Sequence, residues 1–346
     1  MNNSGEPGKI SFATKKFRFS DWFAERFIKV VAFMSIAFVA LIFVFVFREA
    51  FPVFRMDAIQ KIGSANLVQE RYGEEEATPA IENSVSGSTI TISKPSSTLL
   101  SNVWMPVSDN PRYGLIPLFF GTLKVTLIAL LFAAPIAILA AIYTSMFAKP
   151  WIREIIKPAI ELLAGFPSVV IGFFALMVLA TVFPDIFGYA SRLNSFVGGF
   201  AMSLAAIPVI YTITEDALTA VPKTYIEASL GLGASRRQTA FHVVLPAAVP
   251  GIFAAVILGL GRIFGETMIA LMATGNAALT SINPFESVRT LSATIGAEMA
   301  EVVFGDTHYS VLFLIGSLLF IFTFALNAIS EFYFKNLVIR KYQSKK

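Results

Sequence analysis

An arginine and a glutamate, Arg262 and Glu266, lie inside a long apolar stretch of the sequence. An arginine at mid-membrane costs about 2.5–3.5 kcal/mol on insertion scales, so such residues usually face a bundle interior or a wet cavity. Four residues apart on a helix, the two side chains lie on one face within reach of each other. The planar guanidinium suits phosphate oxygens. Glu266 could orient it, or accept a hydrogen bond from a protonated phosphate oxygen, which fully ionised sulfate cannot donate. The pair is either an oxyanion site or an internal ion pair that only fixes packing.

Small and polar residues near this pair add further expectations. Gly261 and Gly265 form a G-x-x-x-G pattern, which lets helices approach closely. We expect it to serve helix packing within the chain rather than contact with another subunit, and either role fits a tight wall opposite Arg262. Gly165-Phe166-Pro167 is expected to break a helix, as a bend that fits the bundle rather than as a break that aims backbone groups into a cavity. Lys124 could snorkel to the membrane surface or attract phosphate.

The composition identifies the class of protein that must position these residues. The chain has 346 residues, of which 55% are apolar and 14% charged, and its mean hydropathy is +0.69. Soluble domains carry roughly 25% charged residues. We therefore expect an all-α polytopic membrane protein. The net charge of +4 then bears on orientation in the membrane rather than on nucleic acid.

Several kinds of chemistry are excluded or disfavoured by residue types. There is no cysteine and there are two histidines, so disulfides, zinc thiolates and a histidine-rich metal site are not expected. The chain also lacks the G-x-x-x-x-G-K-[ST] loop that cradles nucleotide phosphates. We expect no cofactor and no enzymatic activity in this chain, so a separate chain would hydrolyse ATP if ATP is used. One alternative function, that of an intramembrane enzyme, is supported by no clustered His, Asp or Glu motif.

Six stretches have the roughly 20 mostly apolar residues that a membrane-crossing helix needs. They are Val30–Phe47, Phe119–Phe147, Leu163–Phe183, Phe196–Thr214, Ala247–Ala273 and Ser310–Phe334. The first is longer than the roughly 7–15-residue core of a signal peptide and is expected to be an uncleaved anchor. With both termini inside, the inner segments hold 17 lysines and arginines and the outer segments 8, which favours cytoplasmic termini.

These spans divide the chain into five parts. In order they are a basic cytoplasmic tail (1–29), the anchor helix (30–47), an extracytoplasmic loop (48–114), a five-helix core (115–334) and a second basic tail (335–346). The outer loop is expected to be a solvated connector or a small cap that touches an outside partner, and Ser88–Ser93 alternates like a short strand.

The inner loop of the core, residues 215–246, predicts two short helices joined by a turn at Gly231-Leu232-Gly233, because alanine, leucine and glutamine favour helix and glycine interrupts it. Its length would let it project as a docking surface. A plain surface hairpin without a partner fits the composition equally well.

The loop carries a spaced motif. Glu227-Ala228-Ser229 is followed by Gly233 and then by Val243-x-Leu245-Pro246. This pattern resembles the signature of permease subunits of ATP-binding-cassette importers, with mild departures at Ser229 and Val243. The resemblance implies that Glu227, Ala228, Gly233, Leu245 and Pro246 belong to coupling helices that sit in a groove on a separate cytoplasmic ATPase.

Other blocks narrow the resemblance to phosphate permeases. They are Trp104-x-Pro106, Tyr113-Gly114, Pro117, Gly121-Thr122-Leu123, Leu163–Val170, Gly259–Met268 and Leu271–Asn276, and they are similar to PstC-type subunits more than to PstA-type ones. The resemblance covers roughly residues 104–334. It implies a MetI-like core and gives the arginine and glutamate of the fifth span, Arg262 and Glu266, a role in phosphate passage.

The resemblance also implies an assembly in the inner membrane. Its expected partners are a homologous PstA-type permease subunit, two cytoplasmic ATP-binding subunits, an extracytoplasmic phosphate-binding protein, inorganic phosphate and the lipid bilayer. Two alternatives stay open: the same fold importing another oxyanion such as sulfate, molybdate or phosphonate, and an added role in signalling phosphate status.

Overall fold

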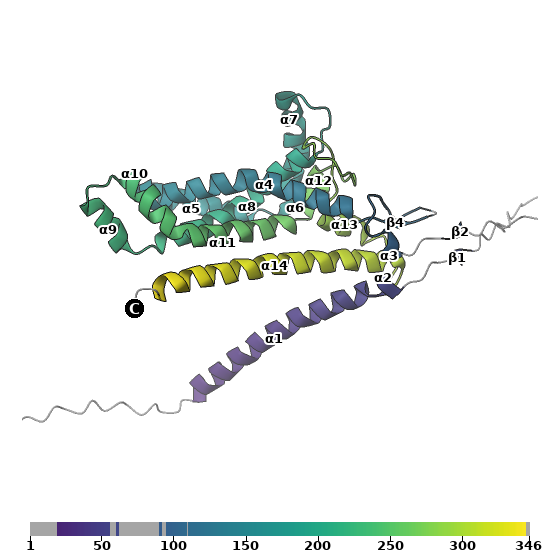
Figure 1. Cartoon of the computed structure of the whole chain (residues 1–346), viewed down its shortest axis with the longest axis horizontal. Helices are drawn as coiled ribbons and strands as arrows, with labels where there is room; N and C mark the ends of the chain where they lie inside the picture. The colour runs from purple at the N-terminus through teal and green to yellow at the C-terminus, as the bar shows by residue number, and fades with distance from the viewer. Residues whose placement is uncertain (1–18, 56–59, 62–89, 92–94, 109, 344–346) are drawn as a thin grey trace, which may run out of the picture. The chain divides into compact units, whose positions relative to one another are not determined.

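The computed structural model describes residues 19–55, 60–61, 90–91, 95–108 and 110–343 (Figure 1). Residues 1–18 of the first expected tail, residues 344–346 of the second and much of the expected outer loop lie outside these residues. The chain divides into two units, residues 1–46 and 47–346. Of the segment expected to alternate as a strand, Ile90–Thr91 is described and pairs antiparallel with Gln60–Lys61.

The first unit is described as one long helix. Helix α1 covers Phe19–Ala50 and its last residues belong to the second unit. It contains the predicted anchor Val30–Phe47 but begins earlier. Lys29 forms a 2.6 Å ion pair with Glu25 one turn before it, and such pairs support a helix outside its apolar part.

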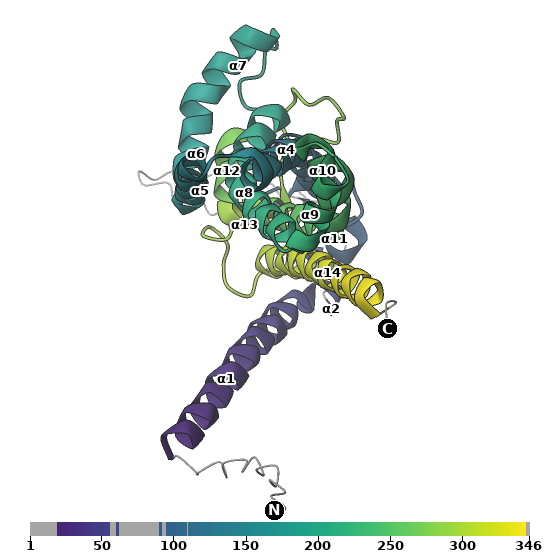
Figure 2. The same ribbon diagram turned by 90° about the vertical axis from the view of Figure 1, so that its left-hand side faces the viewer.

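The second unit is built on four long helices. They are α4 (Ile116–Ile142), α8 (Ser195–Thr219), α11 (Leu245–Phe264) and α14 (Thr307–Gln343). Helices α4, α8 and α11 pack on one another, and α14 packs on α11 (Figures 1 and 2). Three short π-helical segments continue the helices: η1 (Tyr143–Phe147), η2 (Ala175–Leu179) and η3 (Ala240–Val244).

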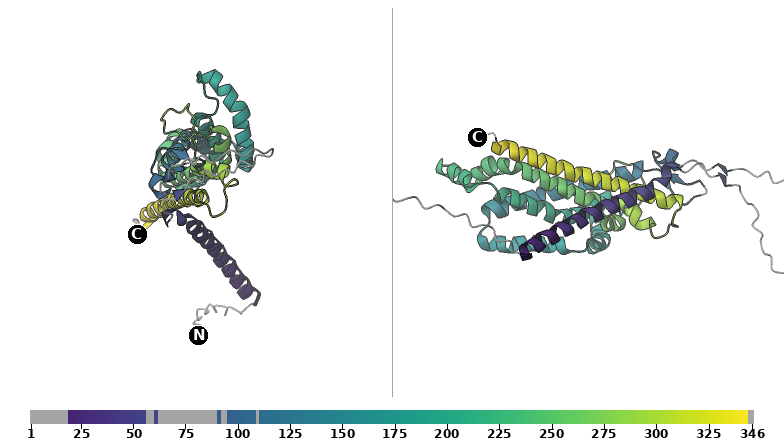
Figure 3. Two further views of the ribbon diagram at one scale, coloured as in Figure 1. Left: turned by 90° about the vertical axis from the view of Figure 1, so that its right-hand side faces the viewer. Right: turned by 90° about the horizontal axis from the view of Figure 1, so that it is seen from below.

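Shorter helices and strands complete the second unit. The helices are α2 (Pro52–Arg55), α3 (Pro95–Thr98), α5 (Pro150–Gly165), α6 (Ser168–Phe174), α7 (Ala180–Phe187), α9 (Lys223–Gly231), α10 (Arg236–Thr239), α12 (Met268–Ala273) and α13 (Leu291–Glu298). The strands are β1 (Gln60–Lys61), β2 (Ile90–Thr91), β3 (Trp104–Met105) and β4 (Arg112–Tyr113), paired β1 with β2 and β3 with β4. Helices α9 and α10 lie at one end and α12 and α13 at the other (Figures 1 and 3).

Small side chains bring α4 and α8 together. Ala129, Ala133, Ala137 and Ala141 recur every fourth residue on α4, and all four are fully buried. A Cβ added at Gly199 on α8 would lie 2.6 Å from an Ile128 methyl, which no real Cβ tolerates. Close backbone approach replaces the hydrophobic driving force that lipid does not provide.

Among the described residues, six helices are long and apolar enough to cross a membrane, which confirms the predicted number. They are Trp22–Arg55, Ile116–Phe147, Ser168–Phe187, Ser195–Thr219, Arg236–Phe264 and Thr307–Phe332. The boundaries of the third span were wrong. The predicted stretch Leu163–Phe183 is interrupted where α5 ends at Gly165 and α6 begins at Ser168, because Phe166 before Pro167 adopts an extended backbone. The interruption expected at Gly165-Phe166-Pro167 is thus present, and its role as a bend that fits the bundle stays a prediction.

Candidate functional site

The fifth span ends in the middle of the segment that was predicted as one helix. Helix α11 stops at Phe264, and α12 starts only at Met268, so the prediction of a continuous helix over Ala247–Ala273 was wrong. Gly265 favours the break because glycine is a poor helix residue. The Glu266 amide donates to the Ile263 carbonyl at 3.0 Å, a tighter turn than an α-helix makes. The Ser292 hydroxyl on α13 donates to the Glu266 carbonyl at 2.7 Å and holds it in place.

Arg262 and Glu266 nevertheless meet across this break. Arg262 Nη1 lies 3.6 Å from Glu266 Oε2, and the side chains are 50% and 5% exposed respectively. That distance is an ion pair without a hydrogen bond. Among the described residues, the Arg262 guanidinium donates no hydrogen bond. The arrangement therefore presents a cation, oriented by a buried carboxylate, whose N–H donors can receive an oxyanion.

Of Gly259, Gly261 and Gly265, Gly259 makes the closest approach. A Cβ there would lie 2.7 Å from Ile210 Cδ1 on α8. At Gly261 an added Cβ would meet Asn327 Oδ1 on α14 at 3.6 Å, an ordinary contact, and at Gly265 the nearest atom would be 3.9 Å away. The packing role of Gly261 and Gly265 stays a prediction.

The expected pair of short helices and its glycine turn are confirmed. Helix α9 ends at Gly231, Gly233 has a φ of +87°, and α10 follows. Ser235 begins α10 with a capping box, its hydroxyl accepting from the Gln238 amide while the Gln238 side chain accepts from the Ser235 amide. The hydroxyls of Ser229 and Thr239 lie 2.9 Å apart and join the two helices.

The loop boundaries differ from residues 215–246. Helix α8 continues to Thr219, so Glu215 lies within this helix, where it is buried and paired rather than solvated. At the other boundary, α10 continues through η3 into α11 without a break. Glu227, Ala228, Gly233 and Pro246 are exposed and Leu245 is half-buried.

The turn between α9 and α10 presents an apolar side chain. Leu232 is 90% exposed at the end of the bundle where α9 and α10 lie (Figure 1). A single exposed leucine does not by itself mark an interface, because scattered apolar residues are normal on protein surfaces.

Sequence reasoning missed a charge cluster that joins α5 to α8. The Glu215 side chain is 2% exposed and accepts hydrogen bonds from Arg153 and from Lys157, the latter at 3.0 Å. The hydrogen bond to Glu215 raises the pKa of Lys157. The only sequence signal was two basic residues four apart on an amphipathic helix.

A second network was also missed, at the opposite end of the bundle. Glu298 accepts from Trp104 Nε1 at 3.1 Å, lies 2.8 Å from His308 Nε2 and forms a 2.5 Å ion pair with Arg289. Burial raises the pKa of Glu298, but these partners outweigh it and leave the pKa below its usual value. Burial, with the nearby charges of Asp306 and Glu298, raises the pKa of Tyr113 to about 12.

Lys124 is held by the loop that follows α12. Its ammonium donates to the carbonyls of Ser281, at 2.9 Å, and Asn283. Two of its three donors are therefore satisfied within the chain. Within the described residues, no group of three or more histidines, aspartates or glutamates could hold a metal ion.

Comparison with known proteins defines the class. Residues 133–339 match the family described as binding-protein-dependent transport system inner membrane component, and the chain belongs to this family. It is a multi-pass membrane component of a transport system rather than an enzyme.

Particular relatives can then be named. The chain is 34% identical over 253 residues to the phosphate transport system permease protein PstC of Mesorhizobium japonicum, covering 68% of this chain and 76% of that one. It is 35% identical over 226 residues to the "Probable ABC transporter permease protein YqgH" of Bacillus subtilis, covering 65% and 73%. A solved inward-facing MetNI methionine ABC transporter aligns with a TM-score of 0.46 at 20% identity, over 64% of this chain and 94% of that one.

Proposed function

We propose that this chain is the permease subunit of an ATP-driven importer of inorganic phosphate, and that Arg262 binds phosphate during passage. The observation that carries the proposal is the half-exposed Arg262 guanidinium, fixed by Glu266 at a helix break in the membrane. A cation in a membrane-crossing helix is retained where it serves a pathway. The PstC name of several relatives supports phosphate as the anion.

The pair can act on phosphate in two ways. The planar guanidinium can donate two parallel hydrogen bonds to phosphate oxygens, which a single ammonium cannot match in geometry. Glu266 lies 3.6 Å from Arg262, so it could accept a hydrogen bond from a protonated oxygen of a phosphate bound to Arg262. Sulfate offers no such proton, so Glu266 would disfavour it by repulsion.

The remaining surfaces suit the expected partners. The exposed residues Glu227 and Ala228 of α9 and Gly233 of the α9–α10 turn would dock on a cytoplasmic ATP-binding subunit. Leu245 and Pro246, the first residues of α11, would link this surface to that helix. A PstA-type subunit would supply the other half of the pathway. A phosphate-binding protein would deliver its ligand at the end that carries α12 and α13. The lysines and arginines of both tails support a cytoplasmic location for the two termini.

The proposal is tested by phosphate uptake in cells that express this chain with its operon partners. Wild type is compared with Arg262→Gln and with the exposed control Arg112→Gln, at equal membrane levels, with excess sulfate or molybdate as competitors. We expect uptake that the competitors do not suppress, lost in Arg262→Gln and kept in the control. Uptake that persists in Arg262→Gln would make Arg262 structural, and transport of another oxyanion instead would overturn phosphate as substrate.

A further inference from the structure

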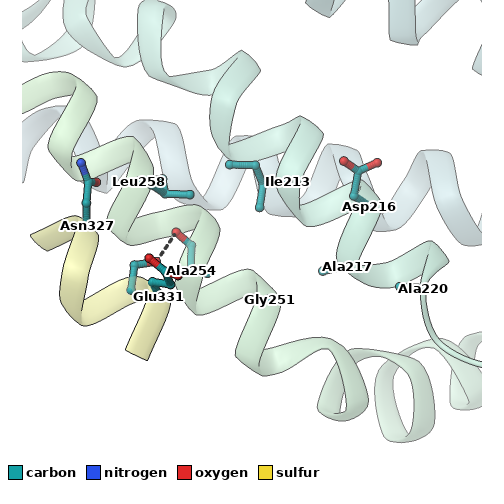
Figure 4. A pocket seen from close by; sticks show the side chains of 10 residues that line it. Ile213, Asp216, Ala217, Ala220, Gly251, Ala254, Leu258, Asn327 and Glu331 are labelled. Carbon is teal, nitrogen blue, oxygen red and sulfur yellow. Dashed lines mark hydrogen bonds between the residues drawn. The ribbon is translucent and has the colours of Figure 1, made fainter. Parts of the chain in front are cut away.

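A cavity of about 560 Å³ opens between α8, α11 and α14 (Figure 4). Small and aliphatic side chains such as Ala217, Gly251 and Leu258 form much of its wall. Two carboxylates, Asp216 on α8 and Glu331 on α14, also line it. The volume falls in the range of small-molecule sites, roughly 300–1,000 Å³.

The cavity leads from the α9–α10 end of the bundle toward Arg262. On α11 its wall includes Gly251, Ala254 and Leu258, and Arg262 follows Leu258 by four residues on the same helix face. At the other end, Ala220 lines the cavity and lies just before α9.

The carboxylates indicate that the cavity contains water. Asp216 and Glu331 lie near the ends of the membrane-crossing helices Ser195–Thr219 and Thr307–Phe332. Ionisable residues in such helices usually face water or a water-filled cavity. Within the described residues neither carboxylate forms an ion pair, and both are exposed. A lipid chain in the same space would leave two charges against hydrocarbon, which is strongly unfavourable.

We propose that this cavity is the aqueous exit of the phosphate pathway, and that Asp216 and Glu331 are specificity-determining residues that repel phosphate from it. The inference rests on the proposed function. Arg262 attracts the anion. The two carboxylates, nearer the end of the bundle that carries α9 and α10 (the coupling side), keep the anion from staying in the exit or re-entering from that side. The charges of one wall thus change sign along the direction of import.

The chain has no cysteine, so a single introduced thiol reports on the cavity without background. The complete transporter carrying Ala254→Cys is reacted, in inside-out vesicles at low salt, with cationic and anionic methanethiosulfonate reagents of similar size. Ala129→Cys, at a fully buried position of α4, is the protected control. We expect both reagents to modify Ala254→Cys, the cationic one at least threefold faster, and this preference to vanish when Asp216→Asn and Glu331→Gln are added.

Two results would overturn the inference. A membrane-soluble maleimide is used as a third reagent. If it reacts at Ala254→Cys and neither charged reagent does, the cavity is filled by lipid or protein. If the two charged reagents react equally fast, the carboxylates do not select. Neither labelling result depends on phosphate, so a failure of this inference can be distinguished from a failure of wild type to take up phosphate.

A transport measurement tests the consequence. ATP-driven phosphate uptake is followed while phosphate on the coupling side is raised, in wild type and in Asp216→Asn/Glu331→Gln. We expect coupling-side phosphate to inhibit the variant several-fold more strongly. Equal inhibition of the two proteins would contradict the role given to the carboxylates.

Discussion

Glu215 and Glu266 are both buried carboxylates in membrane helices or at their ends, and their partners differ. Glu215 accepts hydrogen bonds from two cations on another helix, with Lys157 at 3.0 Å. Among the described residues, the Glu266 carboxylate has one partner, Arg262 at 3.6 Å, and no hydrogen bond joins them. We call the first cluster saturated, because both Glu215 oxygens accept hydrogen bonds. The second is unsaturated, because the half-exposed Arg262 guanidinium still has N–H donors available.

This difference separates a structural ion pair from a candidate binding site. A saturated buried cluster holds two helices in one arrangement and offers nothing to a ligand. An unsaturated one keeps its cation available at the expense of pairing strength. We infer that the Glu215 cluster fixes α5 against α8, and that the Arg262 pair accepts substrate.

The largest effect is expected from removing both cations of the saturated cluster. Arg153→Ala with Lys157→Ala removes both partners of Glu215, which costs about 1–3 kcal/mol, less than for a fully buried pair because both cations are 40% exposed. Thermal unfolding in detergent should show a large loss of Tm and of folded protein. Adding Glu215→Leu should restore much of it, because an apolar replacement removes the stranded charge. A triple variant as unstable as the double one would show that the cluster is not what fixes α5.

The opposite outcome is expected for the unsaturated pair. Glu266→Gln should change stability by at most about 1 kcal/mol, since its partner is half exposed. The preference for phosphate over sulfate should fall about tenfold or more, because a hydrogen bond to a charged group is worth about 1.5–3 kcal/mol. Competition of sulfate with labelled phosphate uptake measures it. An unchanged preference would leave Glu266 as a support for Arg262 only.

The sequence predicted the parts of this comparison that lie close together in the chain. Arg262 and Glu266 could be paired from their spacing, and the two helices around Gly233 from their glycines. The break at Gly265 was not predictable, because membrane helices tolerate glycine when neighbouring groups satisfy the backbone, here Ser292. Glu215 meets Arg153 from 62 positions away, and only the packing of α5 on α8 brings them together.

A smaller effect separates two glycines at the α9–α10 turn. Gly233 has a φ of +87°, where a Cβ is strained, so Gly233→Ala should cost about 1 kcal/mol and distort the turn. Gly231→Ala is the matched control, since it ends α9 with open space around it. ATPase activity of the assembled transporter, stimulated by the loaded binding protein, should fall in the first variant and persist in the second. Equal activity in both would argue against a docking role for the turn.

Glu298 tests whether saturation alone marks a structural carboxylate. Like Glu215 it has several partners, among them Arg289, His308 and Trp104, and they hold its pKa below the usual 4.5. The folded state therefore binds its proton less readily than the unfolded state, so stability from this group is complete above pH 4.5 and is lost as pH falls through the lower folded pKa. Tm measured from pH 7 to pH 3.5 should drop more steeply in wild type than in Glu298→Gln, with phosphate uptake at neutral pH nearly unchanged in the variant. A loss of uptake at equal membrane levels would instead place this network in the transport cycle, and saturation would no longer distinguish the two kinds of carboxylate.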